Sequence, residues 1–167
     1  TDKGQTRAGA AVARGEELFN TKLSRITDVS GINDEEVLGS RAVVNGSCTT
    51  CQDTPNSGNN SVAAPLNLGL TEAERRTPDM PLYTLRNRTT DEIKVTTDPG
   101  RALVTGKWKD IGRFKGPILR GIAARAPYFH NGFAKDLKAV IDFYDERFAI
   151  GFTEQEKADL LAFLMTL

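Results

Sequence analysis

The chain is poor in the residues that most metal and redox sites use. Its 167 residues include only two cysteines, one histidine and two methionines, and 22 lysines and arginines balance 22 aspartates and glutamates. Without a basic excess, the chain has no electrostatic signature of nucleic-acid binding. No apolar run approaches the roughly 20 residues that a membrane-spanning helix needs. We therefore expect no nucleic-acid partner and no membrane span.

The length favours one domain, and an apolar fraction of 39% allows a modest core, which a large prosthetic group could supplement. The chain starts at Thr1 rather than at a methionine and carries no signal peptide. We therefore expect a processed mature chain or an excised fragment.

A helix is predicted over residues 9–20, because apolar and small residues recur there at helical spacing. The stripe consists of Val12, Gly15, Leu18 and Phe19. Gly15 has no side chain, so we expect a second helix to approach closely at this point.

The last third of the chain has the clearest helical pattern. One face recurs at i, i+3, i+4, i+7 and i+11, and it consists of Leu137, Val140, Ile141, Tyr144 and Phe148. Gly151 ends that segment, and Thr153 and Glu156 form a capping box that begins another helix. The apolar stripe of that helix consists of Leu160, Leu161, Leu164 and Leu167.

The remaining chain reads mostly as loop. Residues 53–69 are dense in Pro, Gly, Asn and Ser, which predicts a long loop, and residues 96–100 predict a turn. Pro117 could begin a short helix over 117–125. Strand alternation is weak, so a short strand at 93–95 is the most that we expect. The fold class is therefore mostly α with long loops.

Cys48 and Cys51 form a Cys-x-x-Cys pair, a pattern that occurs in several kinds of site. A thioredoxin-type dithiol needs a nearby βαβ pattern, which is not visible. A structural zinc site needs four ligands, more than two cysteines and one histidine supply. A plain disulfide or an inert thiol pair is also compatible. The remaining alternative is haem attachment at Cys-x-x-Cys-His, although the residue after Cys51 is Gln52.

Four segments together resemble the C-terminal haem domain of the bacterial dihaem cytochrome c peroxidase/MauG superfamily. They are ARGEELFNT (13–21), GSCTTCQD (46–53), residues 112–144 with the block APYFHNG, and residues 152–167. The resemblance spans nearly the whole chain. It implies a single cytochrome c-like helical domain over 1–167, with loop-rich insertions at about 21–45 and 53–110. It also implies that long loops wrap round one haem c, bound covalently through Cys48 and Cys51.

The resemblance also implies roles for single residues. Gln52 holds the place of the proximal iron ligand, and His130 is a possible distal-pocket residue. Tyr144, fourteen residues after His130, takes the distal axial position, which is Tyr in MauG-like members. The buried helix face is compatible with this role and also with an ordinary core tyrosine. Gln52 could be natural, engineered or misassigned, and its carboxamide is a much weaker donor than imidazole.

Other cofactor contacts are weaker expectations. Trp108 is a candidate to pack against the porphyrin, with an ordinary core or loop aromatic as the alternative. Cations must balance the haem propionates, and the candidates are Arg113, Lys115 and Arg120. A solvated basic face is the alternative for these three residues.

Three classes of function remain open. One is a monohaem electron-transfer or redox-accessory protein, and another is a peroxidase-like haem oxidoreductase or a domain of one. A haem-based ligand-binding sensor is a third. The dihaem enzymes carry a second haem domain before this one, which this sequence lacks, so we favour electron transfer with a redox partner protein or a small oxidant. We expect a periplasmic location, where haem c is attached. The sequence does not indicate the oligomeric state.

Overall fold

The computed structural model describes residues 6–36, 39–52 and 64–167. The chain divides into two compact units. Unit 1 consists of Thr1–Thr27, Val43–Val62 and Gly116–Leu167, and unit 2 of Asp28–Ala42 and Ala63–Lys115. Unit 2 falls largely within the two expected insertions, 21–45 and 53–110. One cytochrome c-like domain over the whole chain stays a prediction.

Unit 1 contains three α-helices of more than two turns among its described residues. They are α1 (Arg7–Thr21), α3 (Leu137–Phe148) and α4 (Glu154–Leu164), so the helices expected from the periodicity are confirmed. Each begins at a residue whose side chain accepts a hydrogen bond from the first turn: Thr6, Asp136 and Thr153. These caps satisfy backbone N–H groups that have no partner inside the helix. Both halves of the capping box at Thr153 and Glu156 are present.

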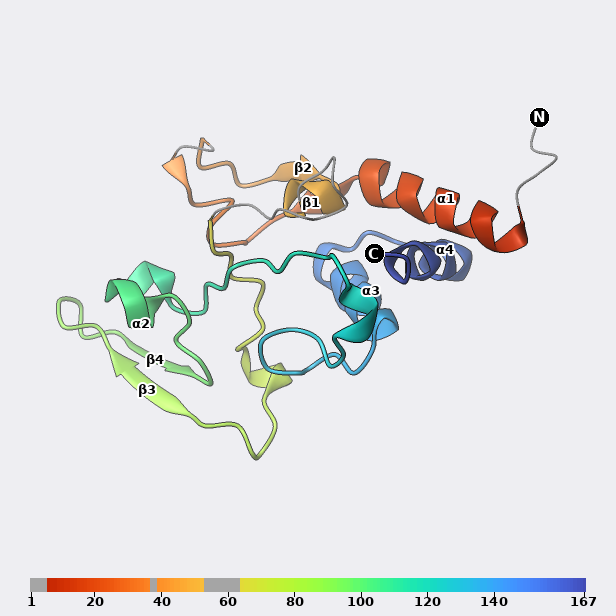
Figure 1. The fold of residues 1–167 in the computed structure, drawn as a ribbon. Coiled ribbons are helices and arrows are strands. Elements are labelled where there is room, and N and C mark those ends of the chain that lie inside the picture. Colours follow the sequence, from red (N-terminus) through yellow and green to blue (C-terminus); the bar gives the residue numbers. More distant parts are fainter. Residues whose placement is uncertain (1–5, 37–38, 53–63) are drawn as a thin grey trace. The chain divides into compact units, whose positions relative to one another are not determined.

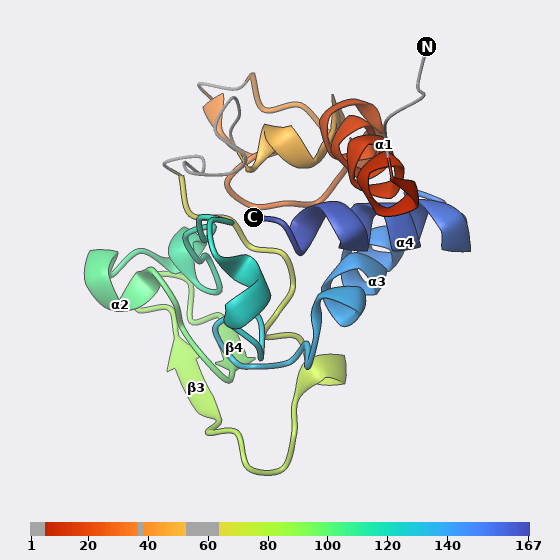
Figure 2. The same cartoon turned by 45° about the vertical axis from the view of Figure 1, so that its right-hand side comes forward.

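Helices α1 and α4 pack against each other (Figures 1 and 2). Gly15 is the point of closest approach, as expected. A Cβ atom there would collide with the carbonyl oxygen of Asp159 and lie 2.8 Å from the Cβ of Phe163. Arg14 donates two hydrogen bonds, each of 2.7 Å, to the buried carboxylate of Asp159. The rings of Phe19 and Phe163 pack 5.5 Å apart.

The core of unit 1 collects residues from both ends of the chain. Its buried members are Phe19, Leu119, Ile122, Tyr128, Ala134, Leu137, Ile141, Phe152, Leu160, Phe163 and Leu164. The stripe expected on the last helix is confirmed, since Leu160 and Leu164 are buried and Leu161 and Leu167 pack against them. Phe143 is also buried, although it lies off the face that the periodicity picks out on α3.

Two short sheets go beyond the one strand expected. In unit 1, β1 (Ser24–Ile26) pairs antiparallel with β2 (Val44–Gly46). In unit 2, β3 (Tyr83–Arg86) pairs antiparallel with β4 (Ile93–Thr96), which contains the expected strand at 93–95. Unit 2 also contains α2 (Ala102–Thr105) and the 3₁₀ turns η3 (Ala73–Arg75) and η4 (Trp108–Asp110). Figure 2 shows the β3–β4 hairpin.

The helix expected to begin at Pro117 is wrong. Residues 115–119 have no regular secondary structure, and only a 3₁₀ turn, η5 (Ile122–Ala124), follows. Leu119 is buried in the core of unit 1, and Gly121 is left-handed with φ of 68°. Tertiary burial of Leu119 therefore overrides the local preference of proline for a first helical turn.

The described residues thus form four α-helices with two small antiparallel sheets, and a cytochrome c-like arrangement stays a prediction. No described helix combines the length and the apolarity that crossing a membrane requires. The loop expected at 53–69 lies mostly outside the described residues.

The close approach of α1 and α4 yields a first prediction. Gly15→Ala should lower the free energy of unfolding by about 1–3 kcal/mol, because the new methyl group forces the two backbones apart. This loss should appear even though alanine favours a helix interior by about 1 kcal/mol over glycine. Chemical denaturation measures it. The control is Ala13→Gly on the exposed side of α1. It should lower the free energy of unfolding only by the difference in helix propensity between alanine and glycine. A Gly15→Ala protein as stable as the parent would contradict the packing.

Candidate functional site

The two cysteines lie on one tight turn of unit 1. The 3₁₀ turn η2 (Cys48–Thr50) is closed by the backbone N–H groups of Cys51 and Gln52, which both donate to the carbonyl of Cys48, at 3.3 and 2.9 Å. Ser47 and Thr50 close the turn from the other side, since the N–H of Ser47 donates to the Thr50 hydroxyl at 3.1 Å. Both thiols are half-buried and unbonded to each other, and Cys48 packs against the core.

Burial sets the chemistry of these thiols. It raises the pKa of Cys48 to about 11, with the neighbouring Cys51 adding to the shift, and it raises the pKa of Cys51 to about 11. Both thiols are therefore protonated near neutral pH. Reactive dithiols of the thioredoxin type have lowered pKa values, so the environment disfavours that alternative. Among the described residues, no cluster of three or more His, Cys, Asp or Glu could hold a metal ion.

Tyr144 lies close enough to the turn to interact with both thiols. Burial raises its pKa well above the ordinary value for tyrosine, and charge on Cys51 or Cys48 would raise it further. Its hydroxyl forms no hydrogen bond with any residue that the structure describes. A buried tyrosine hydroxyl usually has a partner, as Tyr128 does in donating to the carbonyl of Ile122 at 2.9 Å. Tyr144 itself is half-buried, and it differs from Tyr128 in its electrostatic interaction with the two thiols.

Gln52 directly follows the second cysteine and has an unsatisfied acceptor. Its Oε1 atom is buried and accepts no hydrogen bond from the described part of the chain. Leaving a buried carbonyl oxygen unpaired costs about 1–3 kcal/mol. Such an atom has its lone pairs free for another electron acceptor, such as a metal ion.

These observations test whether the site fits a c-type haem. Covalent attachment needs two thiols three residues apart, and an axial site needs donor atoms that are not already engaged. Cys48 and Cys51 satisfy the first need. The Tyr144 oxygen and Gln52 Oε1 satisfy the second, so the donor set fits the group.

His130 is more exposed than the four residues of the site, which are Cys48, Cys51, Gln52 and Tyr144. It lies exposed in a turn of unit 1, between Tyr128 and Ala134, which are paired by an antiparallel bridge. The preceding residue, Phe129, packs against the core. A distal-pocket role for His130 stays a prediction.

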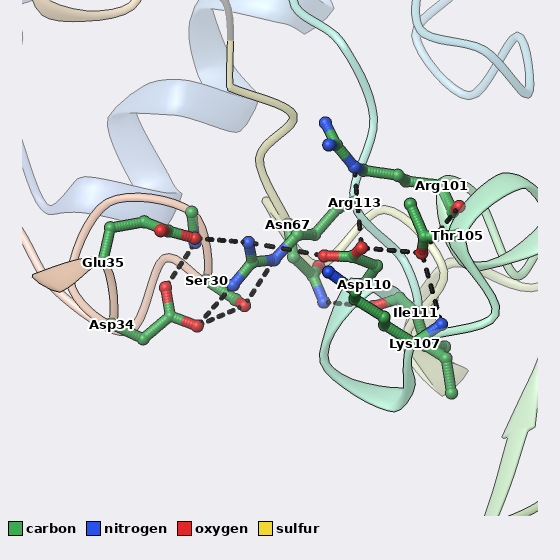
Figure 3. A network of polar contacts seen from close by, with 11 residues as sticks. Ser30, Asp34, Glu35, Asn67, Arg101, Thr105, Lys107, Asp110, Ile111 and Arg113 are labelled. Carbon is green, nitrogen blue, oxygen red and sulfur yellow. Dashed lines mark hydrogen bonds and ion pairs between the residues drawn. The ribbon is translucent and has the colours of Figure 1, made fainter. Parts of the chain in front are cut away.

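Arg113 has a structural role that the sequence does not indicate. Its side chain is buried in unit 2 (Figure 3). It donates to Ser30 at 2.9 Å, Glu35 at 2.7 Å and Asp34 at 2.5 Å. The buried carboxylate of Asp110 lies 3.6 Å from the same guanidinium. Ser30, Asp34 and Glu35 lie about 80 residues away in sequence, so no local pattern reveals them as partners of this guanidinium.

The three other expected cofactor contacts are more exposed than Arg113, and Lys115 is exposed. Arg120 is exposed in unit 1, and Trp108 is half-buried in the 3₁₀ turn η4 of unit 2. Trp108 and Arg113 thus belong to a different unit from Cys48 and Tyr144. A haem contact by Trp108, Arg113 or Arg120 stays a prediction.

Known proteins similar to this chain include two cytochrome c peroxidases and a MauG protein. The cytochrome-c peroxidase IdrP1 of Denitromonas iodatirespirans is 33% identical over 72% of this chain and 36% of its own length. The cytochrome c551 peroxidase of Nitrosomonas europaea is 27% identical over 96% of this chain and 44% of its own length. The methylamine utilization protein MauG of Paracoccus denitrificans is 51% identical over 21% of this chain and 9% of its own length.

These similarities support the dihaem cytochrome c peroxidase/MauG superfamily, which the sequence resembles. No family model and no solved structure matches the chain. The chain spans less than half the length of each of these relatives.

The buried thiols yield a prediction on pH. In the haem-free chain, unfolded thiols ionise near pH 9 and folded thiols only near pH 11. Between these values the folded chain holds more protons, so stability is complete below about pH 9 and is lost as the pH rises toward 11. The double variant Cys48→Ala, Cys51→Ala should lose less stability between pH 8 and 10.5 in urea unfolding. Equal pH dependence in both proteins would show that the thiols are not buried.

Proposed function

We propose that this chain carries one haem c, bound covalently through Cys48 and Cys51, and acts as a periplasmic electron-transfer protein. The observation that carries the proposal is the convergence of two protonated, half-buried thiols with Tyr144, which interacts with both, next to the unsatisfied Oε1 of Gln52. Each thiol would add across a vinyl group. A C–S bond then forms, and the thiol hydrogen passes to the other vinyl carbon, so that no external oxidant is needed.

Tyr144 would be the distal axial ligand. A phenolate is a hard anionic donor, and tyrosine ligates haem iron in catalase. Because burial opposes its ionisation in the haem-free chain, the positive charge of ferric iron has to stabilise the phenolate. This ligation should favour the ferric state and depress the reduction potential.

Gln52 would face the iron from the proximal side. Its Oε1 is buried and unsatisfied among the described residues, which suits a ligand, but a carboxamide oxygen is a neutral and weak donor. The proximal side should therefore be loosely held. His130 supplies the one imidazole of the chain and is the rival donor.

Haem supplies one-electron chemistry when it is bound. The chain's own residues would bind it, exclude water with the core of unit 1, and favour the ferric state through Tyr144.

A second candidate function is a peroxidase-like activity. It is favoured by the names of the relatives and by the weak donor at Gln52, which leaves a position that a small oxidant could take. We expect the redox partner to be another protein, or a small oxidant, that binds at this site.

Covalent attachment is tested by mass. Expressed with a haem c maturation system, the denatured protein should have the mass of the polypeptide plus one haem, because thioether bonds survive unfolding. Cys48→Ala and Cys51→Ala should each leave one thioether, and the double variant none. A parent protein that denatures to the bare polypeptide mass would reject the proposal.

Tyrosine ligation is tested by removing one hydroxyl. Tyr144→Phe should abolish the tyrosinate-to-iron charge-transfer band and raise the reduction potential. The matched control is Tyr128→Phe, which should lose only a buried hydrogen bond, about 1 kcal/mol of stability, and keep the band. If Tyr144→Phe has the spectrum and potential of the parent, Tyr144 is an ordinary core residue.

The proximal side is tested by restoring an imidazole. The parent should be largely high-spin and bind added imidazole or cyanide readily, and Gln52→His should bind both more weakly. It should also be more stable, because a ligand that binds only the native state stabilises that state. In the parent, His130→Ala should leave the spectrum unaltered. Conversion of a low-spin iron to high-spin by His130→Ala alone would make His130 the proximal ligand.

A further inference from the structure

Phe129 has a backbone conformation that bulky residues rarely adopt. Its φ is 65°, in the left-handed region, where a non-glycine residue costs of order 1–3 kcal/mol and persists only if its surroundings enforce it. The loop does enforce it. The N–H of Tyr128 donates to the carbonyl of Ala134 at 2.7 Å, and the N–H of Gly132 donates to the carbonyl of Phe129 at 3.4 Å. The hydroxyl of Tyr128 anchors the loop to Ile122 at 2.9 Å.

The strained turn directs the Phe129 ring inward, onto helix α3. It meets the ring of Phe143 edge-on, with centroids 4.8 Å apart, and the ring of Tyr144 at 6.2 Å. Edge-on and tilted aromatic contacts at these distances are attractive. A left-handed residue at this point therefore places an aromatic ring beside the tyrosine that interacts electrostatically with both thiols.

Two other rings touch Tyr144, and both belong to α3 itself. Phe143 lies 5.2 Å away and Phe148 stacks at 6.2 Å. These neighbours move with the helix and hold the Tyr144 ring only relative to α3. Among the described residues, Phe129 is the ring contact of Tyr144 that comes from another segment. It alone among these contacts can fix the ring relative to the rest of unit 1.

We propose that Phe129 is a positioning residue for Tyr144: its ring, held by the left-handed turn, keeps the Tyr144 hydroxyl directed at the Cys48–Cys51 turn. This inference rests on the proposed ligation by Tyr144. Phe129 itself touches no reacting atom. Phe129 acts only through the orientation of the Tyr144 ring. A general loss of stability would not change that orientation in the folded protein.

The test compares two substitutions in the same loop of the haem-loaded protein. Phe129→Leu removes the ring next to Tyr144. Phe133→Leu makes the same change at a residue that is 44% exposed and whose ring meets Phe143 at 6.5 Å. The readouts are the ferric tyrosinate charge-transfer band, the affinity for cyanide, and the midpoint of thermal unfolding.

We expect Phe129→Leu to broaden or shift the band and to raise the cyanide affinity at least about three-fold, the equilibrium equivalent of one lost aromatic pair. Phe133→Leu should change neither readout, whatever its effect on unfolding. Phe129→Tyr, which keeps the ring, should retain the band of the parent. A Phe129→Leu protein that unfolds earlier but keeps the parent's band and cyanide affinity overturns the positioning role and leaves ligation intact.

A second measurement separates the inference from the ligation. If the parent has no tyrosinate band and Tyr144→Phe changes nothing, ligation itself fails. The ring-flip rate of Tyr144 in the haem-free chain, measured by NMR, then decides the role of Phe129. It should rise in Phe129→Leu and stay unchanged in Phe133→Leu. An unchanged rate in Phe129→Leu overturns the positioning role independently of the haem.

Discussion

The approach of α1 and α4 at Gly15 is the contact on which the rest of unit 1 depends. It joins the two ends of the chain, and the buried carboxylate of Asp159 secures it by pairing with Arg14. Helix α1 also packs against the 3₁₀ turn that carries Cys48, while α4 packs against α3, which carries Tyr144. Closure of one helix pair thereby brings the cysteine turn and the tyrosine helix into the same core.

The candidate site is defined by one buried, unsatisfied oxygen next to two thiols, with a half-buried tyrosine interacting with both thiols. Gln52 Oε1 accepts no hydrogen bond among the described residues, and the two thiols are held protonated. Buried polar groups are normally paired, so the exception at Gln52 points to a ligand. Under the proposed function, a weak neutral donor and a hard anionic donor share one iron. This combination favours the ferric state and differs from the ligation of a high-potential electron carrier.

Unit 2 illustrates how charge can mislead a sequence-based prediction. Arg113 reads as a candidate partner for haem propionates, because cations must balance carboxylates. In the structure, its guanidinium balances carboxylates of the protein instead, those of Asp34, Glu35 and Asp110 (Figure 3). A buried arginine without such partners would be strongly unfavourable. Arg113 therefore holds together the two chain segments of unit 2, whatever else it contacts.

Local sequence alone determined the helices of unit 1. Residues within four positions of one another decide helical periodicity and capping, so the stripe through Gly15 and the capping box of Thr153 and Glu156 could be predicted. The spacing of Cys48 and Cys51 is equally local. For the same reason, these features are independent of where the rest of the chain lies.

Only the tertiary structure decided which of these side chains meet and which stay unpaired. The β1–β2 pairing, the burial of Phe143 and the irregular chain after Pro117 each depend on residues distant in sequence. The proximity of Tyr144 to the cysteines depends on them as well, since 93 positions separate it from Cys51. Burial and long-range pairing are properties of the whole packed chain, and a local pattern carries no information about the partner that arrives from elsewhere.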